Sequence, residues 1–217
     1  FFNEKYENTP KNKIRNLSDY FELIKDNKLQ FAPGSQQQYS NAGYIVLGLI
    51  IERVTGQDYY TYVRENIFKP AGMTNTDSYE MDAVIPNIAT GYTHPEGDEK
   101  NWISNIYSSP KRGSSAGGGY STAEDLFKFI HALRNGKILS PKYSAWMLTR
   151  DLPATDPQLP IKDGSIGIAG GAPGINSVVD YDSKSGNIVI VLCNLDPPAA
   201  MEVSKKMKGY MRRFVRG

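Results

Sequence analysis

The segment PGSQQQYSNAGYIVLGLIIERVTG, residues 33–56, joins a loop to an apolar helix and places two polar side chains at the junction. A Pro-Gly pair breaks the chain first. Residues 41–55 are then apolar on most of a helical circumference, which predicts a buried helix that Gly56 ends. Tyr39 and Asn41 stand two residues apart where this helix begins, so either chemistry or packing has to explain them.

The composition excludes several classes of protein. Of 217 residues, 40% are hydrophobic and 22% are charged, which is typical of a globular chain with a real core. A net charge of +2 without a recognition motif argues against a nucleic-acid partner. The longest apolar run, residues 44–51, is far shorter than the roughly 20 residues of a membrane span. Cys193 is the only cysteine and no metal or cofactor motif occurs, so we expect no disulfide, metal or cofactor.

Helix signals dominate the first 150 residues. The expected helix starts are Ser18, Asn41, Asp58, the capping box of Ser121 and Glu124, and Ser140–Pro141. The helix after Asp58 is expected to end at Pro70. Residues 71–120 are rich in Gly, Pro, Asn and Ser and lack sustained periodicity, which predicts long surface loops.

The pattern becomes β-like from about residue 164. Three strands are expected, over residues 164–171, 175–181 and 187–195. A closing helix follows, with apolar residues at i, i+4, i+7, i+8 and i+11, namely Val203, Met207, Tyr210, Met211 and Phe214. This order of elements predicts an α+β fold, because helices come first, an antiparallel meander follows, and a covering helix ends the chain. We treat residues 1–217 as one partial domain, helical and loop-rich over 1–150, with the strands and last helix over 151–217.

Tyr39 and Asn41 allow two interpretations. Tyrosine has an ordinary pKa near 10, but a nearby lysine and a helix N-terminus would favour its phenolate form, which could accept a proton from a hydroxyl nucleophile. Asn41 carries both a donor and an acceptor, suited to holding a lysine ammonium and a substrate amide together. Alternatively, Asn41 only caps the helix and Tyr39 packs on the loop, and the tripeptide by itself favours this structural interpretation.

The wider sequence contains several long motifs in a fixed order. They are FAPGSQQQYSNAGYIVLGLIIERVTG (31–56), IFKPAGMTNT (67–76), IATGYT (88–93), SSAGGGYSTAEDLFKFIHAL (114–133) and GGAPGINSVVDYDSKSGNIVIVLCNLDPPAA (170–200). Together they cover nearly the whole chain, and they resemble the serine β-lactamase and penicillin-binding-protein superfamily. The branch they resemble most is the class C β-lactamase-related hydrolases, which include esterases and D-aminopeptidases.

The resemblance implies a serine hydrolase that forms an acyl-enzyme, with a β-lactam, a D-amino-acid peptide or a small ester as substrate. It implies that Tyr39 is the proton-transfer residue and that Asn41 positions polar groups. It also implies that Ala169, Gly170 and Gly171 line the substrate, with the Gly171 N–H as one oxyanion donor. Members of this family are commonly exported by bacteria, which implies a periplasmic or extracellular location.

Two departures from the family pattern are visible. The family's nucleophile lies in a Ser-x-x-Lys motif well before Tyr-x-Asn, but no such motif precedes Tyr39. The one occurrence, Ser108 to Lys111, comes later and contains Pro110, which would disrupt the helix that the motif needs. Where relatives carry His-Gly-Gly or Lys-Thr-Gly, this chain has Ile168-Ala169-Gly170, which offers only backbone groups.

These departures leave two hypotheses for the chain. In the first, it is the C-terminal portion of a serine hydrolase, lacking the N-terminal helix and strands of the fold, which a missing segment or a second chain supplies. In the second, it is a non-catalytic family member or fragment that binds a peptide or ester or serves as a scaffold. Under both hypotheses we expect the 217 residues by themselves to be inactive, because a tyrosine base without its serine and lysine loses the activated nucleophile.

Overall fold

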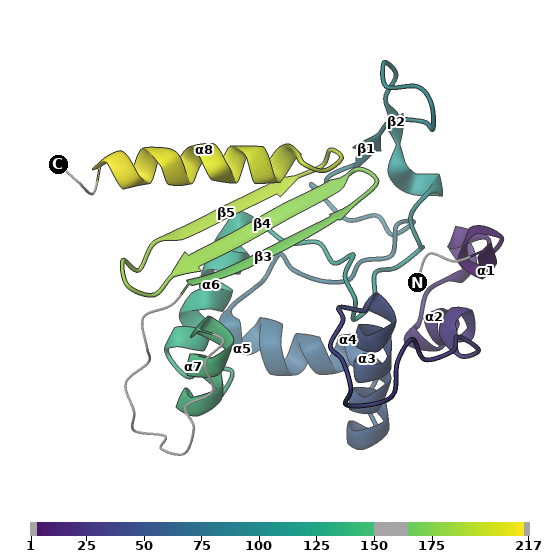
Figure 1. The fold of residues 1–217 in the computed structure, drawn as a ribbon, viewed down its shortest axis with the longest axis horizontal. Coiled ribbons are helices and arrows are strands. Elements are labelled where there is room, and N and C mark those ends of the chain that lie inside the picture. Colours follow the sequence, from purple (N-terminus) through teal and green to yellow (C-terminus); the bar gives the residue numbers. More distant parts are fainter. Residues whose placement is uncertain (1–3, 150–164, 215–217) are drawn as a thin grey trace. The chain divides into compact units, whose positions relative to one another are not determined.

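The computed structural model describes residues 4–149 and 165–214 and confirms the α+β fold (Figure 1). Its internal contacts divide the chain into two units, and each is described by itself. The helical unit comprises Phe1–Arg64, Asp77–Asn87 and Tyr107–Tyr120, and the sheet unit comprises Glu65–Thr76, Ile88–Ile106 and Ser121–Gly217.

The helical unit begins with short helices. They are α1 (Glu4–Glu7), a 3-10 helix (Lys11–Lys13), α2 (Leu17–Ile24), α3 (Asn41–Thr55) and α4 (Tyr59–Val63). The start of α2 differs from the prediction, because Asn16 and not Ser18 caps it, and the Asp19 carboxylate accepts the Asn16 N–H at 2.8 Å. The core of this unit is a buried cluster made of Tyr6, Ile14, Leu17, Tyr20, Leu23, Ile24 and Ile45.

Helix α3 has the predicted bounds, and Gly56 ends it with a left-handed φ of 67°. Its predicted burial is wrong, since only Ile45 and Gly48 are buried. Several apolar residues of α3 are each more than one-third exposed, namely Tyr44, Val46, Leu47, Ile50 and Val54. The reason is that α3 packs along one face, where a Cβ at Gly48 would lie 2.5 Å from Leu17 Cδ1. Within the described part of this unit, the opposite apolar face has no cover.

Helix α4 begins as predicted, with Asp58 Oδ1 accepting the Tyr60 N–H at 2.9 Å. The helical path does not end at Pro70, because it continues through a π-helical segment (Arg64–Phe68) and a short α5 (Lys69–Ala71). Pro70 is tolerated because it lies in the first turn of α5, where a missing N–H breaks no helical hydrogen bond. Gly72, with φ of 73°, provides the actual stop.

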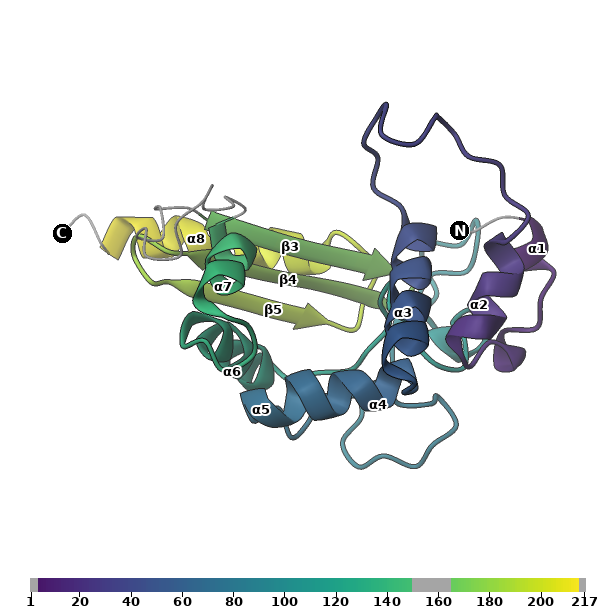
Figure 2. The same ribbon diagram turned by 90° about the horizontal axis from the view of Figure 1, so that it is seen from below.

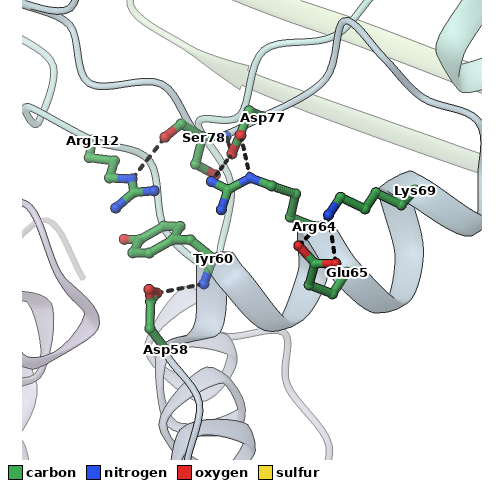
Figure 3. A network of polar contacts seen from close by, with 8 residues as sticks. All are labelled: Asp58, Tyr60, Arg64, Glu65, Lys69, Asp77, Ser78 and Arg112. Carbon is green, nitrogen blue, oxygen red and sulfur yellow. Dashed lines mark hydrogen bonds and ion pairs between the residues drawn. The ribbon is translucent and has the colours of Figure 1, made fainter.

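Two arginines fasten the segments of residues 77–87 and 107–120 to this region (Figure 3). Arg64 forms a two-pronged ion pair with Asp77, with Nε–Oδ2 at 2.8 Å and Nη2–Oδ1 at 3.1 Å. Arg112 donates from Nε to the Ser78 carbonyl at 2.8 Å while its guanidinium covers the Tyr60 ring at 3.5 Å. A planar guanidinium can pair and stack at once, so long loops are held here without regular secondary structure.

The sheet unit contains the predicted antiparallel meander, β3 (Ser165–Ala172), β4 (Ile175–Asp182) and β5 (Ile188–Cys193), in the order β3-β4-β5. Helix α8 (Ala199–Phe214) covers one face, and α6 (Ala123–Arg134) and α7 (Pro141–Thr149) cover the other (Figures 1 and 2). The buried cluster between α6, α7 and the sheet consists of Ile130, Leu133, Leu148, Ile166 and Tyr181.

The predicted loops of residues 71–120 are not free of secondary structure. A two-stranded hairpin lies within them, in which β1 (Tyr92–Thr93) pairs antiparallel with β2 (Ile103–Ser104). A 3-10 turn over Asn105–Tyr107 follows. Strands of two residues are too short to give a period-2 pattern, so the sequence carries no signal for them.

Helix α8 is present but faces the sheet with a different side from the one predicted. Of the predicted stripe, Val203, Met207 and Tyr210 are exposed, Met211 is half-buried, and the Phe214 side chain lies outside the described residues. Ser204 is buried instead and donates to Asp180 Oδ2 at 2.9 Å. Lys208 donates to the same oxygen at 2.7 Å. The half-buried Asp180 of β4 sets the helix orientation, because a carboxylate partly removed from water requires donors and apolar side chains supply none.

The start of α6 is shifted by one residue from the predicted capping box. Thr122 is the cap, and its Oγ1 accepts the Asp125 N–H at 3.1 Å. Asp125 itself is fully buried, and its carboxylate accepts from the Asn75 N–H at 2.7 Å and the Thr76 hydroxyl at 2.9 Å. Lys128 adds a charged donor at 3.2 Å. This carboxylate therefore joins α6 to the segment that follows α5.

Replacing Asp125 with alanine is expected to lower the free energy of unfolding by about 2–4 kcal/mol, because the Asn75 N–H and Thr76 hydroxyl lose their buried acceptor. Urea unfolding measures this loss. Glu124→Ala is the matched control, since it removes the exposed partner of the same Lys128, and it should change stability by less than about 0.5 kcal/mol. Equal losses from the two variants would contradict the assigned role of Asp125.

The penalty of Asp125→Ala also depends on pH. Burial would raise the Asp125 pKa, but hydrogen bonds from Asn75, Thr76 and Lys128 outweigh burial and hold this pKa below its ordinary value. A lowered carboxyl pKa stabilises the fold above the ordinary value of about 4, and that stabilisation is lost as pH falls through the folded pKa. The difference between wild type and Asp125→Ala should shrink accordingly at acidic pH.

Candidate functional site

Tyr39 and Asn41 interact directly at the N-terminus of α3. The Tyr39 hydroxyl donates to Asn41 Oδ1 at 2.8 Å, and the tyrosine side chain is 71% exposed. Its ring lies 5.7 Å from the ring of Tyr44, at a tilt of 45°. The pair is thus open to solvent, with the phenol oriented by an amide at the positive end of a helix dipole.

Asn41 is not the helix cap. Ser40 takes that role, with extended backbone angles and an Oγ that accepts the Gly43 N–H at 3.1 Å. The Asn41 side chain is therefore left for its contact with Tyr39. The structural interpretation of the pair, in which Asn41 only caps the helix, is therefore wrong for Asn41.

The start of α3 is fixed by a neighbouring loop of the same unit. Ser115, in the Ser-Ser-Ala-Gly-Gly-Gly turn, donates from its hydroxyl to the Tyr44 carbonyl at 2.7 Å. A Cβ at Gly48 would lie 2.5 Å from Ser115 Oγ, so only glycine permits this approach one turn further along the helix. The first turn of α3, and with it Tyr39 and Asn41, rests on this contact.

The second candidate element lies at the end of β3 in the sheet unit. Ala169, Gly170 and Gly171 are all exposed there. Ile168, which the resemblance places at the position of the family's His or Lys, is an apolar side chain and is 52% exposed. This stretch offers backbone groups as its only hydrogen-bonding groups.

The register of the β3-β4 hairpin determines where those backbone groups point. Ala172 pairs with Ile175 across the two-residue turn, and Gly171 pairs with Asn176. Hydrogen-bonded and non-hydrogen-bonded pairs alternate along an antiparallel ladder, and a two-residue turn closes on a hydrogen-bonded pair. Gly171 is therefore in a non-hydrogen-bonded pair, with its N–H directed away from β4 and toward the opposite edge of β3, which is open as far as residues 4–149 and 165–214 show.

Polar side chains that the sequence did not single out hold this hairpin in place. Asp196 accepts the Gly174 N–H at 2.6 Å and, on its other oxygen, the Thr93 hydroxyl and the His94 N–H, both at 3.1 Å. Burial would raise the Asp196 pKa, but these hydrogen bonds keep it below the ordinary value. Asn105 is buried and donates to the Pro173 carbonyl at 2.9 Å, so the β1-β2 hairpin and the β3-β4 turn are joined twice.

A further missed residue is Asn176 of β4, which is buried and donates to the Gly170 carbonyl. The sequence did contain one sign of this residue's role, because Asn176 is a polar residue at an inward position of the strand INSVVDY. Such a residue indicates a buried hydrogen bond, but the sequence does not name the partner.

The late Ser-x-x-Lys does not form a nucleophile helix. Ser108 and Pro110 lie in turn and loop backbone after the 3-10 turn that ends at Tyr107. The Lys111 ammonium forms an ion pair with Asp82. The charge of the lysine is thereby paired with a carboxylate, which agrees with excluding this motif as the nucleophile.

Two negative findings apply to residues 4–149 and 165–214. No group of three or more His, Cys, Asp or Glu side chains in these ranges could hold a metal ion. No helix in the same ranges has the length and hydrophobicity needed to cross a bilayer.

Comparison with known proteins identifies the family. The sequence model of the Beta-lactamase family matches residues 1–208. The chain belongs to this family. It is 34% identical over 182 residues to the "Putative penicillin-binding protein PbpX" of Bacillus subtilis (strain 168), an alignment covering 79% of this chain and 44% of PbpX. The chain therefore spans less than half the length of this curated family member.

Solved structures agree with the family identification. A penicillin binding protein from Bacillus halodurans matches with a TM-score of 0.84 and 30% identity, over 94% of this chain and 66% of that one. A D-amino acid amidase from Ochrobactrum anthropi SV3, complexed with D-phenylalanine, matches with a TM-score of 0.67 and 25% identity, over 87% and 60% of the two chains. The resemblance inferred from the motifs is confirmed at the level of family and fold.

Gly171→Ala should destabilise the sheet unit, because a Cβ there would overlap Pro197 Cγ. We expect a loss of about 1–3 kcal/mol, the usual cost of overpacking, in urea unfolding followed by tyrosine fluorescence. Gly170→Ala is the matched control, since its Cβ would meet Ser177 Oγ at an ordinary 3.5 Å. A loss from Gly170→Ala as large as that from Gly171→Ala would contradict the described packing.

Proposed function

We propose that this chain supplies the proton-transfer and oxyanion elements of a serine hydrolase site that works through an acyl-enzyme. The carrying observation is the Tyr39–Asn41 hydrogen bond of 2.8 Å, exposed at the start of α3 within a segment that matches the family. The substrate class we propose is a β-lactam, a D-amino-acid peptide or amide, or a small ester.

In this proposal Tyr39 transfers the proton of the nucleophilic serine. Its exposure leaves the phenol oxygen accessible to an incoming hydroxyl. Asn41 holds the phenol in a defined rotamer and presents its amide N–H groups to a substrate carbonyl or a lysine.

The Gly171 N–H is proposed as one of two oxyanion donors. The hairpin register directs this N–H toward the edge of β3 with which no described strand pairs, so no ladder hydrogen bond from the described residues competes for it. The exposed residues Ala169 and Gly170 would line the substrate beside it. Tyr39 and Gly171 belong to different units of the chain, and their assignment to one site rests on the family resemblance.

The serine nucleophile is proposed to come from a segment that precedes this sequence or from a second chain. The 217 residues hold no Ser-x-x-Lys ahead of Tyr39, and the chain spans 44% of the length of PbpX. The uncovered apolar face of α3 and the exposed Val203, Met207 and Tyr210 of α8 are surfaces that such a segment would bury. Residues 1–217 would then be one partial domain of the complete hydrolase, exported as the family's bacterial members commonly are.

The alternative is a non-catalytic member that binds a peptide or ester or acts as a scaffold. Ile168 favours it, because a half-exposed isoleucine replaces the charged or polar side chain expected at the substrate. The two functions differ in one measurable respect, which is whether a covalent adduct forms once Ser-x-x-Lys is present.

The test is covalent labelling with a fluorescent penicillin and a fluorophosphonate, followed by intact-mass measurement. The 217-residue chain should form no adduct, and a version extended upstream by the gene's own Ser-x-x-Lys segment, or mixed with a partner chain carrying one, should form one adduct per molecule. Tyr39→Phe should slow acylation of the completed protein by about 10²-fold or more. Its stability should change by less than about 0.5 kcal/mol, since the side chain is 71% exposed.

Ser35→Ala is a suitable control, because it removes an exposed hydroxyl that bonds only to its own loop at Ala32. Acylation of the completed protein that is equally fast in wild type and Tyr39→Phe would contradict the assigned base. The absence of an adduct from the completed protein would leave the non-catalytic alternative standing.

A further inference from the structure

We infer that Asn176 is a positioning residue that orients the Gly170–Gly171 peptide, so that the Gly171 N–H faces the open edge of β3. The inference rests on the proposed function, in which this N–H is an oxyanion donor. Asn176 lies within the motif of residues 170–200, on the strand that pairs with β3, and the resemblance assigns it no role.

Asn176 uses both ends of its amide in the interior of the sheet unit. The side chain is 2% exposed, Nδ2 donates to the Gly170 carbonyl at 2.9 Å, and Oδ1 accepts the Ala200 N–H at 2.7 Å. Ala200 is fully buried in the first turn of α8. One side chain thus links the end of β3 to the start of the covering helix.

The contact with the Gly170 carbonyl controls the next N–H through peptide geometry. In a trans peptide the C=O of one residue and the N–H of the next point in opposite directions. Holding the Gly170 carbonyl toward Asn176 therefore turns the Gly171 N–H away from β4. The same direction follows independently from the hairpin register.

A side-chain restraint adds to the strand pairing at this point, where the two glycines bring no stiffness of their own. Two consecutive glycines have the widest choice of backbone angles of any dipeptide. The packing of Gly171 against Pro197 also forbids a side chain that could restrict it. A buried asparagine that makes two hydrogen bonds provides this second restraint, and its donation to the Gly170 carbonyl polarises the peptide and strengthens the N–H as a donor.

The experiment compares three variants. Asn176→Asp keeps an oxygen for the Ala200 N–H but removes the donor to Gly170, and Asn176→Ser is a second, uncharged replacement. Ser204→Ala is the matched control, because it breaks another buried bond between α8 and β4, to Asp180, without touching Gly170. Each is made in the 217-residue chain and in the completed protein of the labelling test.

The first readout is independent of activity. In the glycine-labelled 217-residue chain, NMR follows the Gly170 carbonyl carbon and the Gly171 amide. Both Asn176 variants should shift these signals and speed Gly171 amide exchange, while Ser204→Ala should leave them in place even if it lowers stability. Unchanged Gly170 and Gly171 signals in a folded Asn176 variant would overturn the inference.

The second readout is acylation of the completed protein by p-nitrophenyl acetate. Misaligning one oxyanion donor should lower kcat by about ten- to a hundredfold with KM nearly unchanged, whereas Ser204→Ala should change neither by more than about twofold. Wild-type kcat in both Asn176 variants would refute the positioning role. If the completed wild type does not acylate at all, the proposed function fails, while the NMR result still decides what Asn176 positions.

Discussion

The end of β3 can lie against the β5–α8 connection because Gly171 carries no side chain there. A Cβ at this position would overlap Pro197, so the approach is closed to every other residue. The pairing of β3 with β4 brings Gly170 within reach of the Asn176 amide, which in turn holds the first turn of α8. The missing side chain at Gly171 and the strand register therefore act together on the strand end, the helix start and the backbone N–H that the proposed chemistry needs.

The sequence predicted where elements begin and end far better than which side of an element is buried. The bounds of α3 follow from a loop, an apolar run and Gly56, all of which are local. The buried face of α8 depends on Asp180, which lies 24 residues before Ser204 and selects it as a donor over Val203 and its apolar neighbours. A helical apolar pattern shows that one side can be buried, but the polar groups of the opposing sheet decide which side is chosen.

The candidate site divides in the same manner. Tyr39 and Asn41 were singled out because they belong to a short motif that resembles the family, and the structure adds a local contact between them. Asn105 and Asp196 were not, since each acts on the β3-β4 turn from a distant part of the chain, 68 residues away in the case of Asn105 and Pro173. Motifs identify groups that act on a substrate, whereas the residues that hold those groups are defined by tertiary contacts that no short pattern contains.

Ile168 and Gly171 show why a departure from the family pattern in a side chain need not abolish an oxyanion donor that is built from the backbone. A side chain at position 168 can contribute only its own polar or charged groups, and the isoleucine found there contributes neither. A backbone N–H cannot be removed by changing a side chain, provided that the peptide keeps its direction. The direction of the Gly170–Gly171 peptide depends on strand register and on Asn176, both of which are intact here. An oxyanion donor built from backbone is therefore the element of such a site that outlasts the loss of its side chains.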